Sequence, residues 1–183
     1  MAVEIALKRD TPIVWADTTD YSTIHGLVRT HQIDMTSLAD GAARQGEDAD
    51  LTAIKAQHYT VKVCVEFGAS APTALEPITV YFGSSASATT GFPGGLGASD
   101  AAYTGRSSDL ANSIRSLVGP FTAPVSALGA GTVQIFEMGV LHGAEVDRYV
   151  VPVLKNDGAQ AFDTDATNMY IALIPHIYED QSA

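Results

Sequence analysis

The chain has 183 residues, a mass of 19.2 kDa, an apolar fraction of 46% and a mean hydropathy of +0.10. This is enough for one domain with a buried core and too apolar for an intrinsically disordered chain. The formal net charge is −11. Nucleic acids and anionic membranes both attract basic surfaces, so we expect neither as a direct partner. No apolar run approaches the roughly 18 residues of a spanning helix, and we expect no secretory signal because the N-terminal stretch lacks an apolar h-region.

Residues 1–30 show no sustained hydrophobic period. They mix the apolar stretches 3–7 and 12–15 with the polar run 17–20, and they include Trp15, the only tryptophan. Two interpretations stay open for this segment. It packs as an extra strand on its own domain, or it lies as an extended arm on a neighbouring subunit. We treat residues 1–30 as an N-terminal arm and residues 31–183 as the domain.

Period-two alternation predicts strands through most of the remaining chain. The clearest signal is residues 58–68, whose core-facing members are Tyr59, Val61, Val63, Val65 and Phe67. Weaker strands are predicted at residues 33–38 and 42–51, and a further strand at 78–82.

The segment 84–106 interrupts this pattern. It is rich in Gly, Ser and Ala, and its only acidic residue is Asp100. Structureless loops longer than about 12–15 residues are uncommon in compact domains. Because Phe92, Leu96 and Tyr103 require a cover, we expect contact with another subunit, and a disordered loop tip is the alternative.

The C-terminal half continues with strands at 116–122, 133–138, 148–154 and 169–175. Before them, residues 108–113 predict one or two helical turns capped by Ser107 or Ser108. The last two strands are expected to be antiparallel neighbours, with Pro152 at a sheet edge or a bulge because proline has no N–H to donate. About eight short antiparallel strands indicate an all-β fold, a β-sandwich of the jelly-roll type.

No motif in the chain carries an identifiable chemistry. The phosphate-binding GxxxxGK[ST] loop, the GxSxG nucleophile elbow and the HExxH zinc motif are all missing. The five histidines are scattered, and the HxxE pairs His142/Glu145 and His176/Glu179 are interpreted as coincidence, because residues i and i+3 of a strand lie on opposite faces. We therefore predict no enzyme activity, no catalytic residue and no cofactor.

Two further features admit a chemical interpretation. Asp157, Asp163 and Asp165 crowd one loop, and their oxygens suit calcium, but Asp also favours turns by bonding its own backbone. No metal site is predicted there. Cys64 alternates with the core-facing valines, which places it on the more polar face as a packing residue rather than a catalytic thiol.

Three stretches resemble a family of small structural proteins from the virions of tailed bacteriophages. They are SLADGAARQG at 37–46, GASDAAYTG at 97–105 and RYVVPVLKNDGAQAFDTDATNMYIALIP at 148–175. The likeness spans roughly residues 33–178. It implies a β-sandwich that decorates or cements a capsid, and no functional residue is carried over from it.

The resemblance also implies partners and a place. We expect a homotrimer that binds the major capsid protein on the outer surface of the virion, after synthesis in the host cytoplasm. Two alternatives remain: a tail or head–tail accessory structural protein, and a carbohydrate- or host-surface-binding module.

Overall fold

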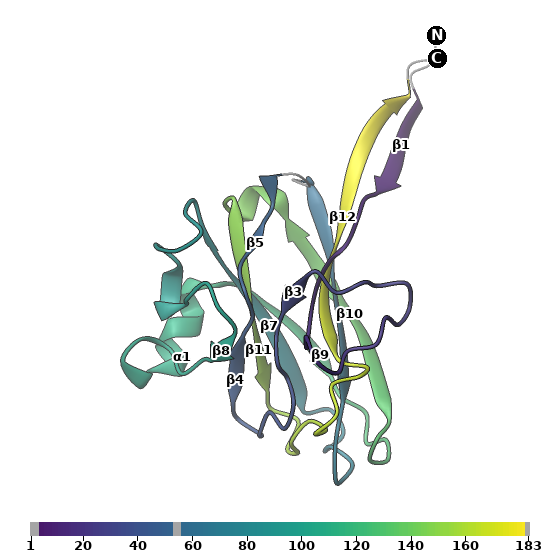
Figure 1. Ribbon diagram of the computed structural model, residues 1–183, viewed down its shortest axis with the longest axis vertical. Coiled ribbons are helices and arrows are strands. Elements are labelled where there is room, and N and C mark those ends of the chain that lie inside the picture. Colours follow the sequence, from purple (N-terminus) through teal and green to yellow (C-terminus); the bar gives the residue numbers. More distant parts are fainter. Residues whose placement is uncertain (1–3, 53–55, 182–183) are drawn as a thin grey trace.

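The computed structural model describes residues 4–52 and 56–181, which fold as a two-layer β-sandwich (Figure 1). Strands make up 41% of the chain and helices 10%, which confirms the predicted all-β class. The described strands form two six-stranded sheets. The first sheet has the order β10-β6-β12-β2-β3, with β1 also paired to β12, and the second has the order β8-β4-β11-β7-β9, with β5 paired to β11.

The strands of the first sheet are β1 (Glu4–Arg9), β2 (Ile13–Ala16), β3 (His31–Gln32), β6 (His58–Glu66), β10 (Val133–His142) and β12 (Tyr170–Gln181). Those of the second are β4 (Ala43–Gln45), β5 (Ala49–Asp50), β7 (Pro77–Ser85), β8 (Ala101–Ala102), β9 (Val118–Pro124) and β11 (Tyr149–Asn156). The pairings are antiparallel except β2 with β3. The long strands match the alternating segments of the sequence.

The core lies between the two sheets and is apolar. The five predicted inward residues of β6 and its extension are at most 1% exposed: Tyr59, Val61, Val63, Val65 and Phe67. They meet Val80 and Phe82 of β7 from the second sheet in one buried cluster. The predicted register of this strand is therefore confirmed.

Two expectations about the C-terminal strands are wrong. β11 and β12 are not neighbours, because β11 lies between β4 and β7 in the second sheet and β12 between β6 and β2 in the first. The connecting loop crosses from one sheet to the other and carries Phe162, which packs edge-on against Phe67 with ring centroids 5.2 Å apart. Loop length alone could not distinguish this crossing from a wide hairpin.

Pro152 lies in a central strand rather than at an edge. Its carbonyl accepts a hydrogen bond of 2.9 Å from the Gly46 N–H, in the short interruption that separates β4 from β5 along β11. The missing proline donor falls at this interruption, so it removes no ladder bond. The irregularity is in the partner strand, which the predicted segment 42–51 had treated as continuous.

The predicted helical turns are present as 3-10 turns and a short helix. Residues Arg106–Ser108, α1 (Leu110–Ser113) and Ile114–Ser116 follow one another. The cap is Asp109, whose Oδ1 accepts from the Asn112 N–H at 3.2 Å, rather than Ser107 or Ser108. Two further 3-10 turns cover Pro93–Gly95 and Gly143–Glu145, and the Gly119–Pro120 peptide is cis.

Of the two interpretations left open for residues 1–30, that of an extra strand on the chain's own domain describes residues 13–16. β2 pairs with β12 inside the first sheet, and Trp15 is fully buried in the common core. β1 and the end of β12 leave the body together. They form a two-stranded ribbon that projects from the sandwich (Figure 1). We call residues 4–9 and 177–181 the terminal ribbon.

Candidate interaction surfaces

Residues 17–30 cover the outer face of the first sheet. Leu27, Tyr21 and Ile24 join a second buried cluster with strand residues that point away from the core. Tyr21 packs edge-on against Tyr170 of β12 with centroids 6.4 Å apart, and its hydroxyl donates to the Leu27 carbonyl at 2.9 Å. The part of the predicted arm that follows β2 is thus a cover for its own domain.

Residues 86–117 cover the outer face of the second sheet in the same manner. Phe92, Leu96 and Tyr103 are at most 8% exposed and pack on Val151 and Val153 of β11. The close approach requires a glycine in β7, because a Cβ at Gly83 would lie 2.2 Å from Leu96 Cδ1. The apolar residues expected to contact another subunit therefore contact their own sheet, and they provide no evidence of a subunit interface.

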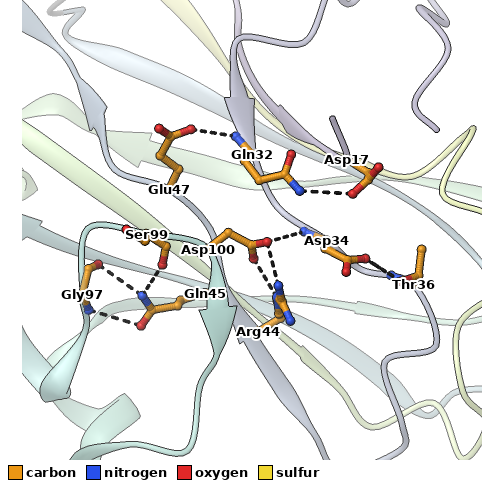
Figure 2. A network of polar contacts seen from close by, with 10 residues as sticks. All are labelled: Asp17, Gln32, Asp34, Thr36, Arg44, Gln45, Glu47, Gly97, Ser99 and Asp100. Atoms are coloured by element: carbon orange, nitrogen blue, oxygen red, sulfur yellow. Dashed lines mark hydrogen bonds and ion pairs between the residues drawn. The ribbon is translucent and has the colours of Figure 1, made fainter. Parts of the chain in front are cut away.

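A polar network fastens this cover to the body (Figure 2). Asp100 receives two hydrogen bonds from the Arg44 guanidinium, from Nε and Nη2 at 2.6 Å each, and a third from the Asp34 N–H at 3.2 Å. The hydrogen bond with Asp100 raises the pKa of Arg44. Gln45 Nε2 donates to the Ser99 carbonyl at 2.6 Å. Paired guanidinium–carboxylate bonds are geometrically specific, so they fix where the cover sits.

A neighbouring part of the network fixes the N-terminal segment. Trp15 Nε1 donates to the Glu47 carbonyl at 2.7 Å, and the Glu47 carboxylate accepts from the Gln32 N–H at 3.1 Å (Figure 2). Asp17 accepts from Gln32 Nε2 at 3.1 Å and from the Thr19 N–H at 2.6 Å. Burial raises the pKa of Asp17, but the hydrogen bonds outweigh it and the net pKa is lowered.

Cys64 lies on the outer face of β6, as its alternation predicts, but this face is not polar at that point. The cover over the first sheet buries the thiol completely. Burial, with a smaller contribution from the Glu66 charge, raises the pKa of Cys64 to about 12. Because the thiolate is the reactive form, the residue serves packing.

The aspartates of the 157–165 loop stabilise turns. Asp157 forms an ion pair with Lys155. Asp163 accepts from the Asp165 N–H at 3.0 Å, and Asp165 accepts from the Thr167 N–H at 2.8 Å. Within the described part of the chain, no three His, Cys, Asp or Glu residues come together as a metal site.

Three histidines that are distant in sequence lie in one row of the first sheet. His58 of β6 is opposite His142 of β10 and His176 of β12. The Nδ1 atoms of His58 and His142 are 3.0 Å apart, and His176 Nε2 lies 2.7 Å from Thr60 Oγ1. The spacing of these histidines in the sequence does not predict the row, because the row arises from the pairing of three strands.

One of the two HxxE pairs also makes contact. Glu145 Oε2 accepts from the His142 N–H at 3.3 Å, because β10 ends at His142 and the chain turns there rather than continuing as a strand. The contact is a local cap. The side chain of Glu179 lies outside what the structure describes, so the second pair stays undecided.

Five large apolar side chains of the described residues are exposed, and two of them lie on β10. β10 is the last strand of the first sheet, and Ile135 and Val140 on its outer face are 44% and 48% exposed. A bulge between Glu137 and Gly139 shifts the register, so that these two side chains share one face in spite of their odd spacing. Leu75 and Val28, in separate loops, are 80% and 63% exposed.

Comparisons with known proteins leave the family open. No protein-family model matches the chain, and no curated protein or solved structure is similar to it. Among the described residues, no helix has the length and apolarity needed to cross a membrane.

Proposed function

We propose that the protein is a non-enzymatic virion component that decorates and stabilises a bacteriophage capsid as a homotrimer, by binding the major capsid protein. The observation that carries the proposal is the outer edge of the first sheet at β10, where Ile135 and Val140 are exposed on the outer face with Glu137 between them. We call this outer face of β10 the strip. An open sheet edge offers unpaired backbone groups for pairing with another chain, and apolar side chains beside such an edge favour burial in the contact. The resemblance of residues 33–178 to virion proteins supplies the kind of partner.

The rest of the body suits a rigid platform. Each sheet is covered by a segment of its own chain, and the Arg44–Asp100 pair holds one of these covers in place. A net charge of −11 supports solubility at high copy number. A cementing protein binds the assembled shell better than separated subunits, so its binding free energy adds to the stability of the lattice.

The strip can be tested by charge. The double change Ile135→Glu and Val140→Glu should abolish binding to capsids that lack the protein, because both carboxylates would be desolvated at the contact. The change Leu75→Glu, at a more exposed leucine, is the matched control and should bind normally. Co-sedimentation with particles measures both, and normal binding by the double variant would contradict the assignment of the strip.

The function is tested on whole particles. Particles without the protein should release DNA at lower temperature and under milder osmotic shock than complete particles, and re-addition of the protein should restore both. Equal robustness combined with failed adsorption to host cells would replace cementing with host-surface binding. Localisation to the tail by electron microscopy would favour the accessory structural role.

A further inference from the structure

The terminal ribbon continues β12 beyond the edge of the body. β12 has 12 residues, and those up to His176 pair with β6, which begins at His58. Among the described strands, β12 pairs only with β1 from residue 177 onward, in the register Glu4 opposite Gln181 to Arg9 opposite His176. Figure 1 shows the two strands leaving the sandwich together.

Both long edges of this ribbon are open. Among residues 4–52 and 56–181, no strand pairs with the second edge of β1 or with the second edge of residues 177–181. An isolated two-stranded ribbon is marginally stable in water, and open strand edges are templates for pairing with another chain. A projecting ribbon with two open edges therefore leaves backbone donors and acceptors on both sides for a further strand to pair with.

The two edges have opposite charge. β1, with the sequence EIALKR, carries two bases and one acid, whereas residues 177–181, with the sequence IYEDQ, carry two acids and no base. Within one copy the register places Lys8 opposite Ile177 and Ala6 opposite Glu179, so base and acid are not directly opposite. Pairing of residues 177–181 between two copies would bring acidic strands together. Pairing of residues 177–181 of one copy with β1 of another joins an acidic strand to a basic one.

We propose that β1 of one copy pairs with residues 177–181 of the next, about a rotation axis that runs along the ribbon. Rotation about such an axis keeps strand directions, so strands alternate and every new junction is antiparallel. Each copy then uses both edges, and the ring closes without an open edge. The proposal rests on the proposed trimeric function for the number of copies, and it names the surface through which they join: three ribbons that form a six-stranded bundle.

The first test is the mass of the purified full-length chain in solution. Light scattering at micromolar concentration should give a trimer, and deletion of residues 1–9 should give a monomer with unchanged circular dichroism. A full-length monomer or dimer, or a trimer that survives the deletion, would overturn the proposal.

Charge exchange separates pairing of the edges from general damage. Lys8→Glu with Arg9→Glu should dissociate the trimer at least tenfold more readily, and adding Glu179→Lys with Asp180→Lys should restore it. Arg106→Glu with Arg115→Glu makes the same charge change at two exposed arginines of the body and should leave the trimer intact. Dissociation by this control, or failure of the fourfold exchange to rescue, would contradict pairing through opposite edges.

Proximity gives an independent readout. Equivalent residues of adjacent ribbons are two strands apart, which is about 10 Å. A pyrene on Ile5→Cys, in a chain with Cys64→Ala, should therefore show excimer emission. The same label on Leu75→Cys, in the loop at the other end of β6, should not, and a trimer without excimer at position 5 would reject the ribbon as the contact. A trimer joined in this manner that fails to bind capsids would leave this inference standing and overturn the proposed function.

Discussion

The two covering segments differ from the terminal ribbon in which groups are buried or paired within one copy of the chain. Residues 17–30 and 86–117 have little regular structure, yet they bury aromatic and aliphatic side chains on the two outer sheet faces. The terminal ribbon has regular strand pairing throughout, yet its edges are open. A segment of this chain can therefore have regular strand pairing and still leave backbone groups unpaired.

The contrast teaches where an interface should be sought. Apolar residues in an irregular segment require burial, and a chain of this size supplies the covering surface itself. Once the strands have left the body, the unpaired backbone donors and acceptors at their edges have no further strand of the same copy to pair with. Changes in the closed body should therefore affect folding stability, and changes in the open ribbon should affect association between copies.

Among single substitutions, the largest effect is expected in the closed body. Val63→Asp would bury an unpaired charge among the core residues of β6, and it should lower the free energy of unfolding by more than about 4 kcal/mol. Lys62→Ala, its neighbour on the half-buried outer face, should change it by less than about 0.5 kcal/mol. Urea denaturation measures both, and similar losses would mean that the two faces of β6 are not distinguished.

Trp15 tests whether residues 13–16 belong to the body. The side chain is fully buried and its indole N–H bonds the Glu47 carbonyl, so Trp15→Ala should cost about 3–5 kcal/mol of stability. Trp15→Phe keeps much of the volume and loses the hydrogen bond, for about 1–3 kcal/mol. Thermal unfolding measures both variants. Unfolding temperatures close to that of the parent protein would show that residues 13–16 are a detachable arm.

Strand existence was predictable because alternation reports burial on one face. Residues 58–68 showed this most clearly, and the structure places all five predicted residues inward. Strand partnership was not predictable, because β11 and β12 have the same local pattern whether their loop returns to one sheet or crosses to the other. Pro152 misled for a related reason: the feature that accommodates it, the break between β4 and β5, lies in a different part of the chain.

The interaction surfaces were predictable only as composition. Phe92, Leu96 and Tyr103 required a cover, but sequence alone cannot distinguish the chain's own sheet from a neighbouring copy. The strip of Ile135 and Val140 depends on a bulge that places residues of unlike parity on one face. The ribbon depends on pairing between the two ends of the chain, for which residues 1–30 gave no period.

The Arg44–Asp100 pair tests the attachment of one cover. The two side chains are 24% and 12% exposed, and Asp100→Ala leaves the guanidinium without its carboxylate. We expect a loss of about 1.5–3 kcal/mol, together with faster hydrogen exchange in residues 92–103 and no change in the core of β6. Uniformly faster exchange throughout the sandwich would show that the cover and the core unfold as one unit.

Acid stability probes the other polar attachment. The net pKa of Asp17 is lowered in the folded state from 3.8, so its contribution is complete above that value and is lost as the pH falls through the folded pKa. Asp17→Asn keeps an acceptor oxygen but loses the charge, so it should cost about 1 kcal/mol at neutral pH, a value typical of one hydrogen bond. The difference in the free energy of unfolding between the two proteins should shrink below about pH 3.8. A difference that grows with acid would contradict a lowered pKa of Asp17.

The smallest effect is expected from removing β1. Within residues 4–52 and 56–181, β1 pairs only with the part of β12 that begins at His176, and the body retains β2, whose Trp15 completes the core. Under conditions where both proteins are monomeric, deletion of residues 1–9 should therefore change the free energy of unfolding by less than about 0.5 kcal/mol. Deletion of residues 1–30 removes β2 and the cover over Cys64, and it should leave no stable sandwich, contrary to what a detachable arm predicts. Denaturant titration of the two truncations, with Cys64 reactivity as a second readout, places the boundary of the body between these limits. A folded product from the longer deletion, or an unfolded one from the shorter, would erase the distinction between a closed body and an open ribbon.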